Sequence, residues 1–188
     1  MLFRSLMSLI EYRLRRDFSK TSEPVPVEVN GLSKNRFIIQ EHQASIFHYD
    51  FRLEMIDEQT GAIVLKSWAV PKNLPLIKEI KHLAIQTEDH PVNYLNFSGE
   101  IPANNYGAGK MLVWDQGKWG LGRGNLSEGK ISFNLFGEKV KGRYQMILTK
   151  GLNQKFKQFS HQHLKEDNKK IRQHSKYWLI WRKGDFIF

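Results

Sequence analysis

The chain has 188 residues and a formal net charge of +10, with 40% hydrophobic and 26% charged residues. This length suits one domain with a real hydrophobic core, and the composition is that of a globular rather than a disordered chain. The sequence contains no cysteine. Disulfides, thiolate zinc sites and cysteine nucleophiles are therefore excluded, and the reducing cytoplasm is the location that we expect.

Residues 1–20 are predicted to form an amphipathic N-terminal helix. Leu6, Ile10 and Leu14 recur at helical spacing, with charged residues between and after them. The apolar stretch at the start is too short to span a bilayer, and no small-residue cleavage site follows it. A helix lying on a membrane surface is the alternative interpretation, but we expect no membrane partner.

From residue 36 onward the chain is predicted to consist mainly of β-strands. Short β-branched and aromatic runs alternate with Gly, Asn, Asp and Pro turns, and no long helical period separates them. This pattern favours a compact antiparallel β-barrel that follows the N-terminal helix in a single domain, 1–188. The expected strands are 36–40, 46–55, 63–70, 82–87, 110–114, 130–136, 140–148 and 177–181.

The segment 47–55 alternates polar and apolar residues without a break. One face of such a strand carries His48, Asp50 and Arg52, while the opposite face is apolar and is predicted to be core. His42 lies upstream of a turn and can return to the same place. Two imidazoles and a carboxylate suit manganese, iron or zinc, and a neighbouring arginine can hold phosphate oxygens. An ordinary solvated strand face is the alternative.

A second run, 81–90, repeats the alternation. One parity carries the mostly polar set His82, Ala84, Gln86, Glu88 and His90. The other carries Leu83 and Ile85, which are predicted to face the core. A histidine in this position can donate to a phosphate oxygen or protonate a leaving alkoxide. A strand-end residue without a chemical role is the alternative reading of His90.

Most of the positive charge lies near the C-terminal end. Residues 138–188 contain 13 Lys and Arg against 4 Asp and Glu, a net charge of +9, which leaves +1 for the rest of the chain. A local basic face is typical of a protein that binds a polyanion, and a solubilising tail is the alternative. We interpret 150–176 as a basic mobile loop. Its predicted nucleic-acid-binding residues are Lys155, Lys157, Lys165, Lys169, Lys170 and Arg172.

Ordered motifs run through the chain outside its first ten residues and 150–175. They include 16–18 (RDF), 36–42 (RFIIQEH), 48–54 (HYDFRLE), 67–72 (SWAVPK), 88–91 (EDHP), 99–102 (GEIP) and 106–109 (YGAG). This set resembles the 3′-phosphoesterase domain of bacterial ligase D and its free-standing relatives. The resemblance implies an antiparallel β-barrel and a manganese-dependent enzyme. Such an enzyme removes a 3′-terminal ribonucleoside to leave a 3′-phosphate, and then removes that phosphate to leave a 3′-hydroxyl.

The same resemblance implies roles for individual residues. It implies that His42, His48 and Asp50 hold Mn²⁺, with other divalent metals as alternatives. By the same match, Arg52, His90 and Tyr94 engage the scissile phosphate, and we take His90 as the candidate that protonates the leaving oxygen. The supporting positions are Gln40, Glu88, Lys72, Arg16, Asp17 and Glu23.

Four positions depart from the family pattern. His82 stands where the family has an arginine, and Gln43 replaces a second histidine that often follows His42. Ser45 and Ile46 stand where basic residues are common. These departures bear on how the substrate is held more than on metal binding.

We therefore predict a hydrolase that heals DNA or RNA-tipped DNA 3′ ends in DNA repair, acting as a monomer. No segment of the 188 residues resembles a polymerase or a ligase, so a separate ligase or polymerase of end joining is the expected partner. The alternative is a non-catalytic basic β-barrel module that binds nucleic-acid ends or recruits repair proteins. The presence together of all six implied metal and phosphate residues favours the enzyme.

Overall fold

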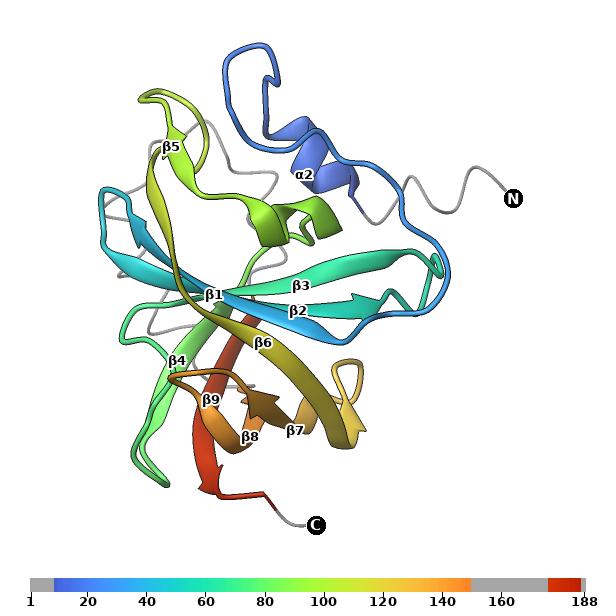
Figure 1. Ribbon diagram of the computed structural model, residues 1–188, viewed down its shortest axis with the longest axis vertical. Coiled ribbons are helices and arrows are strands. Elements are labelled where there is room, and N and C mark those ends of the chain that lie inside the picture. The colour runs from blue at the N-terminus through green and yellow to red at the C-terminus, as the bar shows by residue number, and fades with distance from the viewer. Residues whose placement is uncertain (1–8, 150–175, 187–188) are drawn as a thin grey trace.

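A closed antiparallel β-barrel forms the body of the molecule, as predicted (Figure 1). The computed structural model describes residues 9–149 and 176–186, and the sheet order is β1-β2-β3-β4-β9-β8-β7-β6-β5. Pairing of β1 with β6 closes the barrel, and β5 pairs with β6 outside the ring. The strands are β1 (Arg36–Gln43), β2 (His48–Ile56), β3 (Ile63–Val70), β4 (Lys81–Gln86), β5 (Gly99–Ile101), β6 (Gly109–Asn125), β7 (Lys130–Phe136), β8 (Lys141–Leu148) and β9 (Lys176–Gly184). Helix α2 (Ile10–Leu14) precedes them, and the 3₁₀ helix η1 (Val92–Asn96) follows β4.

The interior of the barrel is apolar. Phe51 of β2, Trp68 of β3, Phe133 of β7 and Trp178 of β9 are each at most 1% exposed and belong to one core cluster. Because side chains alternate along a strand, the residues between them on β2 and β3 point out of the barrel. The prediction that the apolar face of 47–55 forms core is confirmed for Phe51 and Leu53, with Tyr49 and Met55 packed against the core, whereas Phe47 is 45% exposed.

The outer face of β1 and β3 carries a second apolar cluster. Tyr12 of α2, Ile38 of β1, Leu65 of β3 and Tyr94 of η1 pack there and are at most 1% exposed. In Figure 1, α2 and η1 lie together beside this part of the barrel. Strands β1 to β3 are therefore covered on both faces, and polar residues on their outer face are largely removed from water.

The predicted strands match closely, and 63–70 and 130–136 match at both ends. The main difference is β6, which continues to Asn125 although its prediction stopped at 114. The predicted strand ended early because four glycines lie from 117 to 124, and glycine normally weakens a strand. A Cβ atom at Gly117 would collide with the backbone oxygen of Phe136, so a close approach of β7 requires this glycine. Strand β5 was not predicted.

The N-terminal helix is shorter than the predicted 1–20, and the prediction of its buried face was wrong. Helix α2 ends at Leu14, and residues 1–8 lie outside the described part. Ile10 and Leu14 are 37% and 77% exposed, whereas Leu9 and Tyr12 are buried. Tyr12 decides the face, because its ring packs against other aromatic rings of the covering segment. No described helix has the length and apolar character that crossing a bilayer needs.

The prediction for the faces of the second polar run was also wrong. Ala84 is fully buried in the barrel core, while Leu83 and Ile85 are only half-buried. The inward parity tolerates polar residues because each finds a partner: His82 Nδ1 lies 2.7 Å from the oxygen of Asn73, and the Gln86 side chain accepts from a core tryptophan at 3.0 Å. Strand β3 separates β4 from β2, so the two polar runs are not neighbours.

Candidate active site

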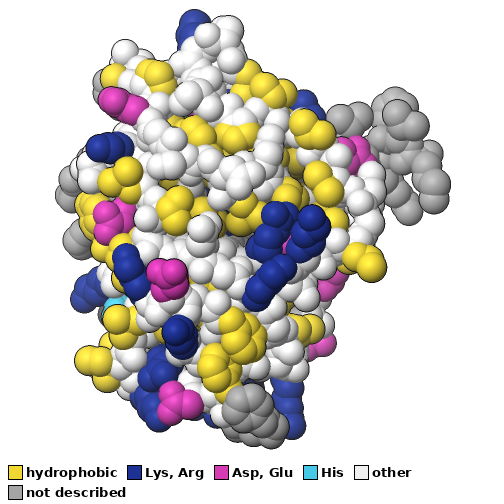
Figure 2. All heavy atoms as spheres, viewed as in Figure 1, with side chains coloured by type: hydrophobic (Ala, Val, Ile, Leu, Met, Phe, Trp, Pro, Cys, Tyr) yellow, Lys and Arg dark blue, Asp and Glu magenta, His cyan; other side chains and the backbone are white. Residues whose placement is uncertain are grey.

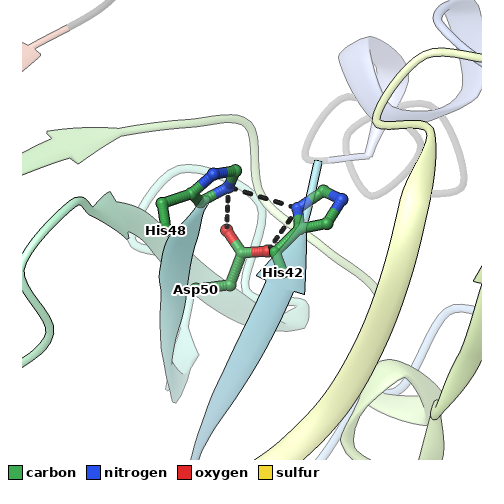
Figure 3. Close-up of side chains that lie close together, drawn as sticks. All are labelled: His42, His48 and Asp50. Carbon is green, nitrogen blue, oxygen red and sulfur yellow. Dashed lines mark hydrogen bonds and ion pairs between the residues drawn. The ribbon is translucent and has the colours of Figure 1, made fainter. Parts of the chain in front are cut away.

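Strands β1 and β2 bring His42, His48 and Asp50 together on the outer face of the barrel (Figure 3). We call these residues the metal triad. His42 Nδ1 lies 3.2 Å from His48 Nε2 and 3.3 Å from Asp50 Oδ2, and His48 Nε2 lies 3.7 Å from Asp50 Oδ1. The antiparallel pairing places His42 directly opposite His48. The expected return of His42 to this face is therefore confirmed.

A backbone carbonyl orients each imidazole of the metal triad. His42 Nε2 lies 2.9 Å from the oxygen of Gly107, and His48 Nδ1 lies 2.9 Å from the oxygen of Ile46. Because a carbonyl oxygen only accepts, these ring nitrogens carry the protons, and the inner nitrogens present lone pairs. In this tautomeric form, two lone pairs and a carboxylate face one another. A divalent cation would stabilise that arrangement, so these residues fit a metal.

Asp50 stays ionised in this position. It is 6% exposed. Burial alone would raise the pKa of its carboxyl, but the charge of Arg52 and the contacts with His42 and His48 together outweigh that effect, and the pKa is lowered to about 2. The metal triad therefore offers a carboxylate at any ordinary pH.

Arg52 is 2% exposed and is held on three sides. Its Nε donates to Gln40 Oε1 at 3.0 Å, and the Gln40 amide in turn donates to the oxygen of Phe97 at 2.8 Å. Its Nη2 lies 3.2 Å from Asp50 Oδ2, and its guanidinium lies 4.7 Å from the ring centre of Tyr94. The remaining nitrogen, Nη1, is buried and has no partner in the described structure. Leaving a charged donor unpaired is costly, so Arg52 is suited to an anionic ligand.

The segment before β1 supplies Arg16 to the opposite side of the site. Arg16 Nε donates to Glu23 at 2.8 Å, and Nη1 donates to Glu88 at 3.0 Å. Its Nη2 lies 3.4 Å from His90 Nε2, and its guanidinium lies 3.8 Å from the ring centre of Tyr12. The three charged side chains are at most 4% exposed. We call Arg16, Glu23, Glu88, His90 and Tyr94 the arginine wall.

His90 is held as a neutral imidazole. Its Nδ1 lies 2.9 Å from the backbone oxygen of Glu88 and so carries the proton, which leaves Nε2 as an acceptor facing Arg16. Burial lowers the pKa of His90 well below its usual value, and the charges of Arg52 and Arg16 lower it further. This form disfavours the predicted role of His90 as the group that protonates the leaving oxygen.

Tyr94 links the arginine wall to Arg52. Its hydroxyl donates to Glu23 Oε1 at 3.0 Å, while its ring lies beneath the Arg52 guanidinium. Burial raises the pKa of Tyr94 well above its usual value, so the hydroxyl remains a neutral donor.

One cavity of about 200 Å³ joins the metal triad to the arginine wall. Arg52 lines it between them. A small cavity that combines a cation-binding group with an unpaired guanidinium nitrogen suits a phosphate bound beside a metal.

The comparison with known families agrees with this chemistry. Residues 40–148 match the family described as the DNA ligase D 3′-phosphoesterase domain. The chain belongs to this family. The fold and the resemblance expected from the motifs are thereby confirmed.

Relatives of the chain are multifunctional non-homologous end joining proteins named LigD. Identity is 48% over 147 residues with the protein of Mycobacterium bovis, covering 76% of this chain and 18% of the relative. It is 48% over 155 residues with that of Mycolicibacterium smegmatis, covering 77% and 20%. It is 45% over 146 residues with that of Pseudomonas aeruginosa, covering 75% and 17%. The phosphoesterase-family chain thus spans about a fifth of the length of these relatives.

Most of the residues proposed from the motifs meet at the cavity, but not all of them. Gln40 reaches it only through Arg52. Asp17 accepts from Ser19 and pairs with Lys20 at 2.9 Å, away from the lining. Lys72 is exposed beyond the end of β3 and does not line the cavity either. Those that do line it are His42, His48, Asp50, Arg52, His90, Tyr94, Arg16, Glu23 and Glu88.

Other predicted positions lie elsewhere. Of the four departures from the family pattern, none lines the cavity. The proposed nucleic-acid-binding residues Lys155, Lys157, Lys165, Lys169, Lys170 and Arg172 lie outside the described residues.

Three contributors to the site were not found from the sequence. Arg15 donates to Glu88 Oε2 at 3.0 Å, and its guanidinium lies 4.9 Å from the ring centre of Tyr106. The Gly107 carbonyl orients His42, although the sequence around it indicates only a tight turn. Thr87 lines the cavity. A carbonyl or a lone threonine carries no sequence signal, but the run Tyr106–Gly109 is one of the motifs shared with the family.

Proposed function

We propose that this chain is a metal-dependent phosphoesterase that processes the 3′ ends of DNA strands, including ends that carry a ribonucleotide. The observation that carries the proposal is the shared cavity. The metal triad and Arg52, whose buried Nη1 has no partner in the described structure, line one space. Membership of the phosphoesterase family supports the same activity.

Manganese is the proposed metal. Two imidazoles and a carboxylate are borderline and hard ligands, which suit manganese, iron or zinc, and the triad contains no soft sulfur ligand. When bound there, the divalent metal would polarise a phosphate oxygen and offset the charge that develops in the transition state.

The protein groups would bind and orient the phosphate. Arg52 presents Nη1 to one phosphate oxygen, and its position is set by Gln40, Asp50 and Tyr94. Neutral His90 offers Nε2 as an acceptor beside Arg16 Nη2, so we propose that it accepts a hydrogen bond in the site rather than giving a proton. The same 3′ phosphate reacts in the diester step and in the monoester step. One arrangement of these side chains around it therefore serves both steps.

We also propose a place for the activity in end joining. The relatives are named as multifunctional end-joining proteins, and a 3′-hydroxyl is the terminus that polymerases extend and ligases seal. The chain would heal a blocked end and leave it to a ligase or polymerase. It would act as a monomer, with the basic residues of 150–176 on the incoming strand.

The test is the conversion of a labelled primer that ends in a 3′-phosphate into one that ends in a 3′-hydroxyl. Protein stripped by exhaustive chelation and dialysis should be inactive, and Mn²⁺ should restore activity better than other divalent ions. A primer ending in one ribonucleotide should first yield the 3′-phosphate. Full activity of the stripped protein would contradict metal dependence. Tight strand binding without cleavage under any metal would instead indicate the non-catalytic module.

A further inference from the structure

Thr87 is a polar residue of the cavity that has no assigned role. Its hydroxyl oxygen is buried and has no hydrogen-bond partner in the described structure. Its side chain lines the same cavity as Arg52 and His90. A buried hydroxyl without a partner is costly, and a ligand that accepts its hydrogen bond would offset that cost.

The register of the strands places Thr87 in one row with Arg52. Arg52 pairs with Ser67 across β2 and β3, and the oxygen of Ser67 accepts the backbone N–H of Thr87 at 3.0 Å. Trp68 and Ala84 point into the barrel core. By alternation, Ser67 and Thr87 therefore point outward, to the same side as Arg52.

Ser67 lies between Arg52 and Thr87 in this row and is fully buried. Its side chain is small, and its hydroxyl is already used by the oxygen of Leu65 at 2.9 Å. Arg52 Nη1 and Thr87 Oγ1 both lack a hydrogen-bond partner in the described structure, and both side chains line the cavity. One is charged and the other is neutral, and both are satisfied by a group with several acceptor oxygens. A phosphate is such a group.

We propose that the Thr87 hydroxyl is a direct phosphate ligand, which donates a hydrogen bond to a non-bridging oxygen of the strand end beside Arg52. This inference rests on the proposed phosphoesterase function. It adds a neutral donor to the metal triad and to the charged residues implied by the family motifs. A hydroxyl that is directed at an anion restricts the phosphate to one rotation in the cavity, which favours alignment for in-line attack.

The test compares Thr87→Val, which keeps the shape and loses the hydroxyl, with Thr87→Ser, which keeps the hydroxyl. In the Mn²⁺-loaded protein, Thr87→Val should lower kcat/KM on the 3′-phosphate primer about tenfold or more, as expected for a hydrogen bond to a charged group. Inhibition by inorganic phosphate should weaken by a similar factor. Thr87→Ser should stay within about threefold of the parent protein on both measures.

A structural role would give a different result. Because the hydroxyl makes no hydrogen bond within the protein, Thr87→Val should be at least as stable as the parent in phosphate-free buffer, and phosphate should raise its Tm less than that of the parent. Thr149→Val is the matched control, since it removes a hydroxyl that donates to the oxygen of Tyr177 at 2.8 Å outside the cavity lining. It should leave phosphate inhibition unchanged.

Two outcomes would overturn this inference, and a third would separate it from the proposed function. Parent-like phosphate inhibition and turnover of Thr87→Val would overturn the inference. Equal losses in Thr87→Val and Thr87→Ser would overturn it too, because packing rather than the hydroxyl would then matter. If the parent cleaves no 3′ end, but Thr87→Val binds inorganic phosphate less tightly than the parent does, the role of Thr87 as a phosphate ligand stands and the proposed function fails.

Discussion

The two sides of the cavity differ in how complete they are without a ligand. In the arginine wall each charge already has an opposite partner: Arg16 is held by Glu23 and Glu88, both within 3.0 Å. In the metal triad, two imidazole nitrogens and a carboxylate face one another, and none of them has an opposite charge among its triad partners when both imidazoles are neutral. The fold alone therefore sets the geometry of the arginine wall. The metal triad gathers donors that fit a cation, so changes on the two sides should have separable effects.

Asp50→Asn should have the largest effect, because it removes the anionic ligand of the metal triad and keeps its size. Turnover should fall by at least about a thousandfold, which corresponds to the several kcal/mol that a metal supplies. Metal affinity, measured by titration with Mn²⁺, should fall with it, while strand binding should persist. Asp185→Asn, at an exposed aspartate paired with Arg182, is the control. A turnover near that of the parent would remove Asp50 from the site.

Arg52→Lys should be nearly as damaging as Arg52→Ala, with a loss of about a hundredfold in turnover. Lysine keeps the charge but cannot bind Gln40 and Asp50 and still direct a third nitrogen into the cavity. Gln43→Ala should be mild, because Gln43 is exposed at the end of β1 and does not line the cavity. Steady-state rates of Arg52→Lys, Arg52→Ala and Gln43→Ala test this prediction. An active lysine variant would mean that Arg52 acts only as a distant charge.

Glu23→Gln should sharpen the comparison between the two sides. It weakens the acceptor shared by Arg16 and Tyr94, so the arginine wall should lose its order and turnover should fall about tenfold. The affinity for Mn²⁺ should not change, since Glu23 contacts no member of the metal triad. Parallel Mn²⁺ titration and kinetic assays test this separation. A matching fall in metal affinity would show that the two sides are coupled.

Charge reversal in 150–176 should have the smallest effect on chemistry. Replacing Lys155, Lys157, Lys165, Lys169, Lys170 and Arg172 by glutamate should raise KM for a long strand about tenfold and flatten its salt dependence. Turnover at saturation should stay near normal, because lost uniform binding appears in KM. A small 3′-phosphorylated nucleotide should be hydrolysed as by the parent. An unchanged salt slope would make this segment a solubilising tail.

The sequence predicted those features that depend on one strand at a time. The uninterrupted alternation of polar and apolar residues located β2 and its polar face. The position of His42 before a turn predicted that its side chain returns to that face. The sequence prediction failed where contacts with another part of the chain decide which face of an element is buried. The barrel interior accepts His82 and Gln86 because Asn73 and Trp178 satisfy them, which reversed the predicted parity of β4. Tyr12 fixes the buried side of α2 through rings that lie about eighty positions later in the chain.

The contact of Arg15 and Arg16 with Glu88 has a consequence for the order of assembly. These arginines precede the barrel, yet their partner lies 73 and 72 positions away. During synthesis they leave the ribosome well before Glu88, so their charges must remain in water until β1 to β4 are in place. Contacts between distant positions form late in folding. The barrel can therefore reach a native core before the cavity acquires its second side, and hydrogen exchange should find residues 9–24 opening more readily than β1 to β3.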